Sequence, residues 1–207
     1  MTTHAIETIE QLEAYYPGIA NISPATWGKE TAKINDDYRR LIEACPFATV
    51  ATEGPEGLDC SPRGDGPGFI RIIDQHTIAL PDRRGNNRLD TLRNIVRTGR
   101  VALLLMIPGL NETVRINGRA LVSVEPDLLE SMAEQGKVPA SAILVTIETM
   151  YFQCARAIIR SRLWQADAQV DPKTLPSAGQ LVRSVMADFD SDSYDAVLPE
   201  RQAKTLY

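Results

Sequence analysis

The residues that decide the fold are Leu80-Pro-Asp-Arg-Arg-Gly-Asn-Asn-Arg-Leu-Asp-Thr-Leu92. A short apolar segment from Thr77 to Leu80 ends at Pro81, which predicts a strand. A polar turn follows it. After the turn, Leu89, Leu92, Ile95 and Val96 recur at helical spacing, and Gly99 is suited to end that helix. The stretch therefore predicts a strand, a polar turn and a helix, in that order.

The turn is rich in arginine and asparagine: Arg83, Arg84, Asn86, Asn87 and Arg88. A helix N-terminus presents unpaired N–H groups and the positive end of the helix dipole. Guanidinium groups bind phosphate through paired hydrogen bonds. The turn thus predicts a phosphate-binding cradle, although arginines near a turn are also common on surfaces. Arg93, Arg97 and Arg100 lie farther along the helix, where we expect a solvated face or ion pairs.

The chain around this stretch is expected to be mainly β with some α. Short apolar or alternating segments predict strands at Phe47 to Thr52, Asp59 to Arg63, Phe69 to Ile73, Thr77 to Leu80, Val101 to Ile107, Thr113 to Val122 and Ile143 to Ile147. The unbroken run from Val101 suits a strand that is buried on both sides. Six or seven short strands with few helices predict a small closed barrel, which leaves no exposed sheet edge.

Two flanking regions differ from this β region, and they give three expected domains: 1–45, 46–165 and 166–207. The first is a helical extension, whose last helix ends at Pro46. The third is a tail with one helix, whose apolar face is formed by Leu181, Val182, Val185, Met186 and Phe189. The aspartates near that helix are interpreted as a solvated acidic end.

Composition excludes several classes of protein. A net charge of −5 over 207 residues disfavours a general nucleic-acid binder, which needs clustered positive charge. Seventeen of the 22 Lys and Arg residues are arginine, which fits phosphate recognition or simply reflects the base composition of the gene. The longest apolar run, residues 101–108, is too short to span a membrane, and no signal peptide is visible, so we expect a cytoplasmic protein.

Cysteine and histidine offer little chemistry. Three cysteines without close pairs argue against a disulfide framework. His4 and His76 are the only histidines, and no Cys/His spacing resembles a metal site. No catalytic residue and no metal ligand is assigned from the sequence.

Four blocks of residues between 47 and 165 carry a family resemblance: Cys60-Ser-Pro-Arg-Gly-Asp65, Leu80-Pro-Asp-Arg-Arg-Gly-Asn-Asn-Arg88, Ile107-Pro-Gly with Glu112-Thr-Val-Arg-Ile-Asn-Gly118, and Phe152-Gln-Cys-Ala-Arg156 with Arg160-Ser-Arg-Leu-Trp164. Together they resemble the pyridoxamine 5′-phosphate oxidase-like family of FMN-binding split barrels. The resemblance implies a split β-barrel with N-terminal helices and a helical C-terminal tail. It also implies a homodimer with one FMN in each cleft between the subunits.

The resemblance also implies roles for individual residues. Arg63, Pro81, Asp82 and Arg83 would line the isoalloxazine and ribityl side. Asn87 and Arg88, with Arg83 or Arg84, would hold the phosphate. Thr113, on the strand that leads to Arg115, would approach the flavin from the next strand, and Arg115 is included among the cofactor-binding residues. Arg162 and Trp164 would come from the partner subunit or from the barrel end.

Two departures from the family pattern bear on the substrate. The C-terminal Arg- and His-containing motif of true pyridoxamine phosphate oxidases is missing, which argues against a vitamin B6 substrate. Gln153 stands where related proteins have a histidine. We expect an FMN-dependent oxidoreductase acting on an unknown small-molecule substrate or electron donor. A non-catalytic flavin protein for storage, sensing or electron relay is the alternative, and a deazaflavin or haem ligand is a third interpretation.

Overall fold

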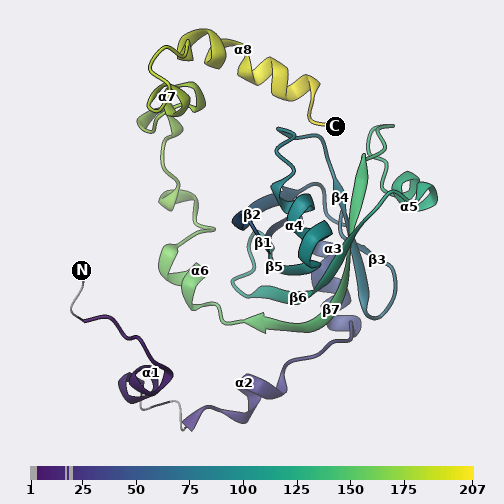
Figure 1. Cartoon of the computed structure of the whole chain (residues 1–207), viewed down its shortest axis with the longest axis vertical. Coiled ribbons are helices and arrows are strands. Elements are labelled where there is room, and N and C mark those ends of the chain that lie inside the picture. Colours follow the sequence, from purple (N-terminus) through teal and green to yellow (C-terminus); the bar gives the residue numbers. More distant parts are fainter. Residues whose placement is uncertain (1–3, 17, 19–20) are drawn as a thin grey trace. The chain divides into compact units, whose positions relative to one another are not determined.

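A computed structural model describes residues 4–16, 18 and 21–207, whose helices and strands are drawn in Figure 1. The chain forms two compact units, Met1–Glu30 and Thr31–Tyr207. The first unit contains the helices α1 (Ile9–Tyr15) and α2 (Pro24–Gly28), neither of which has a buried residue. Thr8 caps α1 through its side chain, which accepts a hydrogen bond from the Gln11 N–H.

A seven-stranded antiparallel sheet with the order β2-β1-β5-β6-β7-β4-β3 builds the second unit. Its strands are β1 (Phe47–Gly54), β2 (Gly57–Gly64), β3 (Arg71–Ile72), β4 (Thr77–Asp82), β5 (Arg100–Met106), β6 (Thr113–Ser123) and β7 (Ser141–Gln153). The helices α3 and α4, whose bounds are given below, pack with the sheet (Figure 1). This mainly β architecture with helical ends is the predicted split-barrel fold class.

The sheet is open rather than closed. Its hydrogen-bonded order ends at β2 on one side and β3 on the other, so the closed barrel expected from the strand count is wrong for the described strands. The long strands β6 and β7 pair over their whole length, with one register shift between Asn117 and Gly118. Such an irregularity bends and twists a sheet locally. The predicted strand that ends at Ile147 is therefore only part of β7, which continues to Gln153.

One hydrophobic core joins the sheet to two helices. The helix α3 (Asp36–Ala44) is capped by Asn35 and buries Ile42. Val114 and Ile116 of β6 are buried, which confirms the predicted alternation of that strand. The strand β5 alternates buried and half-buried residues, so only one of its faces lies fully in the core, and its predicted two-sided burial is wrong.

The strand β4 continues through Pro81, where the sequence predicts that it ends. Pro81 pairs with Ala142 of β7, but β3 reaches only Ile78 and Ala79 on the other side. At Pro81 the strand thus has one neighbour, and an edge position tolerates a residue without an N–H group. The extra length carries the chain to Asp82, which lines the pocket described below.

The helix α4 (Asp90–Thr98) buries only part of the predicted face, because Ile95 lies in the core and Leu92 packs against it. Thr91, Asn94 and Ile95 are buried, whereas Leu89 and Val96 are 46% and 75% exposed. The Asn94 side chain donates a hydrogen bond to Thr52 Oγ1 at 3.2 Å, and such pairing removes most of the cost of burying an amide. Hydrophobic spacing alone could not indicate a polar residue on the buried face.

The chain after β6 contains further helices: α5 (Pro126–Ser131), α6 (Arg156–Ser161), α7 (Ala178–Arg183) and α8 (Ser191–Lys204). The tail thus has two α-helices where the sequence predicts one, and Leu181, Val185 and Met186 are exposed rather than packed. Its aspartates are not all solvated. Asp195 of α8 accepts hydrogen bonds from the Ser177 hydroxyl and the Gly179 N–H, which join α7 to α8.

Among the described residues, no helix is both long and apolar enough to cross a membrane.

Candidate functional site

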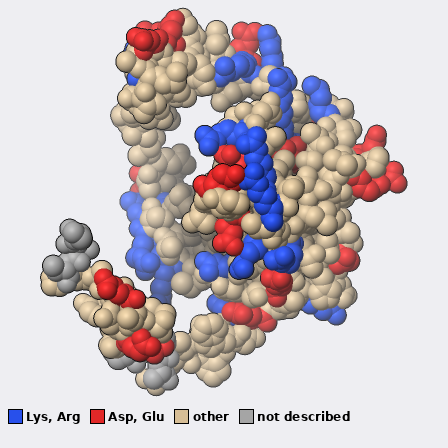
Figure 2. Space-filling model, in the orientation of Figure 1, with Lys and Arg blue, Asp and Glu red and all other residues tan. Residues whose placement is uncertain are grey.

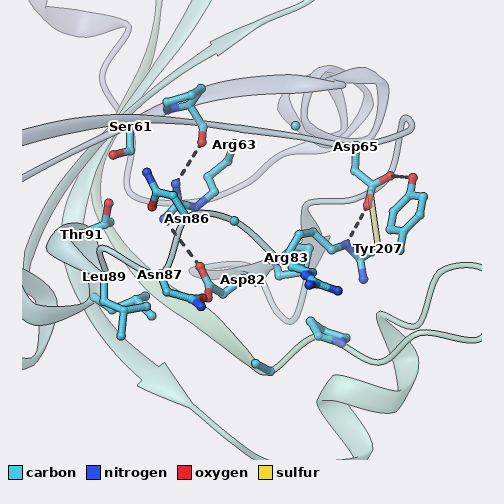
Figure 3. Close-up of a pocket in the computed structure, with 18 of the residues that line it drawn as sticks. Ser61, Arg63, Asp65, Asp82, Arg83, Asn86, Asn87, Leu89, Thr91 and Tyr207 are labelled. Carbon is cyan, nitrogen blue, oxygen red and sulfur yellow. Dashed lines mark hydrogen bonds and ion pairs between the residues drawn. The ribbon is translucent and has the colours of Figure 1, made fainter. Parts of the chain in front are cut away.

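A cavity of about 1060 Å³ lies where β4 ends and α4 begins. Sites for small molecules commonly have volumes of about 300–1,000 Å³, so this space can take a ligand of cofactor size. Its walls come from β2, the turn at 64–69, the loop at 83–89, the start of α4 and the segment 137–140, together with residues 206 and 207 (Figure 3).

The loop between β4 and α4 forms one wall of this cavity. Asn87 and Leu89 have φ angles of 59° and 61°, in the left-handed region that residues other than glycine adopt uncommonly. Leu89 also stands at the N-cap of α4. Its apolar side chain cannot accept a hydrogen bond from the first N–H groups of the helix, as a capping side chain would. The predicted strand, polar turn and helix are confirmed, and the turn brings the N-terminal end of α4 to the pocket.

Each of three pocket arginines faces an aspartate. The pairs are Arg63 Nη2 with Asp82 Oδ1 at 3.6 Å, Arg83 Nε with Asp65 Oδ2 at 2.8 Å, and Arg88 Nε with Asp90 Oδ2 at 2.7 Å. Figure 2 likewise shows basic and acidic side chains lying next to one another on the visible face. Three of the four arginines that line the pocket therefore form ion pairs with aspartates, and the predicted phosphate-binding role of this loop stays a prediction.

Two of these arginines still carry buried nitrogens without a partner. Arg63 Nε and Arg83 Nη1 have no hydrogen-bond partner among the described residues. Their side chains are 20% and 16% exposed. A buried donor without a partner costs free energy, about 1–3 kcal/mol for a typical group and more for a charged one. Both residues line the cavity, so a ligand with acceptor oxygens would supply the missing interactions.

A second polar group lines the cavity beside α4. Asp59 accepts hydrogen bonds from Ser61 Oγ at 3.0 Å and from Thr91 Oγ1 at 2.5 Å. Figure 3 shows Ser61 and Thr91 on one side of the pocket and Arg83 on the other. This group was not predicted from the sequence. Asp59 and Ser61 alternate on one strand, which places them on one face, but nothing in the sequence indicates that Thr91 lies opposite.

Asp65 is held as a carboxylate by its neighbours. It accepts hydrogen bonds from Tyr207 Oη at 2.7 Å, from the Gly66 N–H at 2.8 Å and from Arg83 Nε. Burial raises the pKa of Asp65, but these three donors outweigh burial and hold the pKa below its usual value. The same carboxylate raises the pKa of the Tyr207 phenol. Tyr207 is separated from Asp65 by 142 residues, so sequence spacing gave no signal for it.

Asp82 differs from Asp65 in its electrostatics. Burial raises the pKa of Asp82, and the nearby Arg63 guanidinium opposes this effect only in part. The folded protein therefore disfavours the ionised form of Asp82 relative to the unfolded chain.

We predict that Asp82→Asn raises the free energy of unfolding at pH 7. A folded-state pKa above the unfolded value means that the charged carboxylate costs stability at pH 7. One pKa unit corresponds to about 1.4 kcal/mol. The advantage of the variant should shrink as the pH falls through the raised pKa and vanish below the unfolded value of 3.8. Urea unfolding at several pH values measures this, and a constant difference across the range would contradict it.

The pocket brings together seven of the residues that the sequence analysis assigns to the cofactor: Arg63, Pro81, Asp82, Arg83, Arg84, Asn87 and Arg88. The other four, Thr113, Arg115, Arg162 and Trp164, do not line it. Arg115 donates to Tyr151 Oη at 3.2 Å and to Gln153 Oε1 at 3.4 Å, and Thr113 pairs with Gln153 across the sheet.

Trp164 and Arg162 lie after α6. The Trp164 indole donates to the Leu110 carbonyl at 2.7 Å, which joins this segment to the loop before β6. Arg162 has a left-handed backbone conformation and forms an ion pair with Asp167. A role for these two residues in the site of a partner subunit stays a prediction.

Comparison with known proteins adds the family. Residues 34–154 match the pyridoxamine 5′-phosphate oxidase family, and this range covers more than half of the chain. The chain belongs to this family. The pyridoxamine 5′-phosphate oxidase family is one of flavin-related oxidoreductases, and the match contains the whole sheet, α4 and the loop between β4 and α4.

The chain is also similar, at low sequence identity, to several solved structures. HupZ from Group A Streptococcus is 19% identical with a TM-score of 0.47, and the match covers 57% of this chain and 93% of that one. General stress protein 26 from Bacillus anthracis is 12% identical with a TM-score of 0.42, covering 55% of this chain and 88% of that one. No curated protein sequence matches this one.

Proposed function

We propose that this member of the pyridoxamine 5′-phosphate oxidase family binds FMN in the cavity at the end of β4 and is an FMN-dependent oxidoreductase. The observation that carries the proposal is the pair of buried, unpartnered nitrogens on Arg63 and Arg83 in a cavity of cofactor size. FMN offers a phosphate dianion, hydroxyl groups and a flat ring, which match a site of arginines, polar side chains and partly apolar walls.

Different parts of the pocket would take different parts of the cofactor. Arg83, Arg84 and Arg88 would hold the phosphate, with Asn87 and the backbone N–H groups at the start of α4. Arg63, Pro81 and Asp82 would contact the remainder of the molecule. When bound, FMN supplies hydride and electron transfer, while the protein binds, orients and electrostatically tunes it.

A homodimer is part of the same proposal. The family resemblance implies a cofactor between two subunits, and Thr113, Arg115, Arg162 and Trp164 lie outside the pocket of their own chain. We propose that they serve the site of the partner copy, and that residues 1–45 and 166–207 flank a cofactor-binding domain at 46–165. Light scattering of the FMN complex tests the dimer, and a monomer that still holds FMN would contradict it.

Titration of the purified protein with FMN tests the cofactor directly. We expect saturable quenching or shifting of flavin fluorescence, one FMN per chain, and a Kd in the micromolar range or tighter, which corresponds to about −8 kcal/mol. The flavin absorbance of the purified complex measures the amount of bound FMN independently. Unchanged flavin fluorescence at protein concentrations far above the micromolar range would overturn the proposal.

The same preparation separates the other interpretations. A Soret band in the purified protein would indicate haem, and saturable binding of a deazaflavin without FMN binding would indicate that cofactor. Reduction of bound FMN by NADH or NADPH, followed by repeated turnover with an electron acceptor, would establish an oxidoreductase. Binding without turnover across donors and acceptors would favour a non-catalytic flavin protein.

A further inference from the structure

Tyr207 reaches the pocket from a distant part of the sequence and contacts an ion pair there. Its hydroxyl donates to Asp65 Oδ1 at 2.7 Å, and Asp65 Oδ2 accepts from Arg83 Nε at 2.8 Å. The Arg83 guanidinium lies over the Tyr207 ring, 5.5 Å from its centroid. Figure 3 shows these three side chains grouped on one side of the pocket. Tyr207 thus touches both members of the pair, one by its hydroxyl and the other by its ring.

These contacts restrict what Arg83 can do. Asp65 occupies its Nε edge, and the centroid of the Tyr207 ring lies 5.5 Å from the guanidinium carbon, within cation–π range. Nη1 is buried and has no partner among the described residues. A planar guanidinium with its Nε edge bound and an aromatic ring beside it is restricted in orientation, and its Nη edge remains for another acceptor.

Tyr207 is a wall of the pocket and not a plug. It lines the large cavity and also a smaller one of about 160 Å³, and Asp65, Gly66, Phe69 and Arg83 line both as well. The large cavity keeps about 1060 Å³ with Tyr207 in place. A ligand of cofactor size can therefore bind without displacing the tyrosine.

We propose that Tyr207 is a positioning residue: through Asp65 and its own ring it orients Arg83 toward the phosphate of the bound ligand. This inference rests on the proposed function, because it takes FMN as the ligand. The phenol satisfies Asp65, the carboxylate aligns the arginine, and the Nη edge meets the phosphate. Because coupling between two bound groups is reciprocal, phosphate binding should in turn hold the segment after α8 against the pocket.

Affinities for FMN and riboflavin, measured side by side, test the proposal. Riboflavin lacks the phosphate, so a residue that acts through Arg83 should affect FMN alone. We expect Tyr207→Phe to weaken FMN binding by roughly tenfold, and Tyr207→Ala by more, since a charge-assisted hydrogen bond and then the ring are lost. Riboflavin binding should change by less than about twofold in both variants.

Tyr194→Phe is the matched control. Tyr194 lies in α8 and contacts Phe189 and Arg201, away from the pocket lining. The Tyr194→Phe variant should bind FMN and riboflavin with the same affinities as the wild type. An equal loss of affinity for FMN and riboflavin, or no loss for FMN, would overturn the positioning role of Tyr207. The proposal that the protein binds FMN would not be affected by either result. Tighter FMN binding by Tyr207→Ala would also overturn it, since that result identifies a plug.

Limited trypsin digestion gives a readout that does not depend on flavin affinity alone. Arg201 and Lys204 of α8 lie just before Tyr207 and are exposed. Saturating FMN should slow cleavage at these residues in the wild type but not in Tyr207→Ala, and saturating riboflavin should protect neither. Faster cleavage with FMN, or equal protection in both proteins, would overturn the proposal. Failure of the wild type to bind FMN would overturn the proposed function together with this inference.

Discussion

Arg83→Ala should lower the affinity for FMN by about 100-fold or more, the largest effect of any single arginine in the pocket. Arg83 is 16% exposed, and its Nη1 is buried without a partner among the described residues. Truncating one partner of a buried, charge-assisted contact typically costs about 2–5 kcal/mol, and each 1.4 kcal/mol is tenfold in Kd. Fluorescence titration with FMN measures the change.

Alanine variants of two other arginines serve as comparisons for the loss of FMN affinity in Arg83→Ala. Arg88 is 75% exposed and already bound to Asp90, so Arg88→Ala should weaken FMN binding by less than about tenfold. Arg100 lies outside the pocket and pairs with Glu53, so Arg100→Ala should leave binding unchanged. Arg83→Lys keeps the charge but loses the planar fork, and should recover only part of the affinity. If Arg83→Ala binds FMN as tightly as Arg100→Ala, the assignment of the phosphate site to Arg83 is wrong.

The parts of the fold that sequence could predict are those set by local chemistry. Alternation in β6 indicates which residues are buried, because side chains of a strand point to opposite faces in turn. Asn35 caps α3 because its amide oxygen accepts from the Tyr38 N–H, three residues on. The polar turn before α4 was predictable for the same reason, since strand, turn and helix each leave a local pattern.

The rest depends on contacts between segments far apart in the chain. Asn94 is buried because Thr52 pairs with it, and Pro81 continues a strand because β3 stops short of it. The contacts of the candidate site could not be predicted from the sequence for the same reason. Arginine enrichment indicated the loop, but the partnering of Arg83 by Asp65, and of Asp65 by Tyr207, arises only from the fold.

Gly118→Ala should destabilise the protein by about 3 kcal/mol or more, or prevent folding. A Cβ at Gly118 would lie 2.1 Å from the Thr146 carbonyl oxygen and 3.1 Å from its carbonyl carbon. Both atoms are backbone atoms of β7, which cannot rotate away as a flexible side chain would. Overpacking of a tight site typically costs 1–3 kcal/mol, and this contact is closer than ordinary packing permits.

The position of Gly118 makes relaxation costly as well. It stands at the register shift of β6 against β7, and β7 also pairs with β4, which carries Asp82 to the pocket. Moving β7 away would therefore disturb both ladders at once. Gly85→Ala is the matched control, because open space surrounds its Cβ position, and it should change stability by less than about 0.5 kcal/mol. Urea unfolding distinguishes the two variants, and similar midpoints would show that β6 and β7 separate at this point more easily than their pairing indicates.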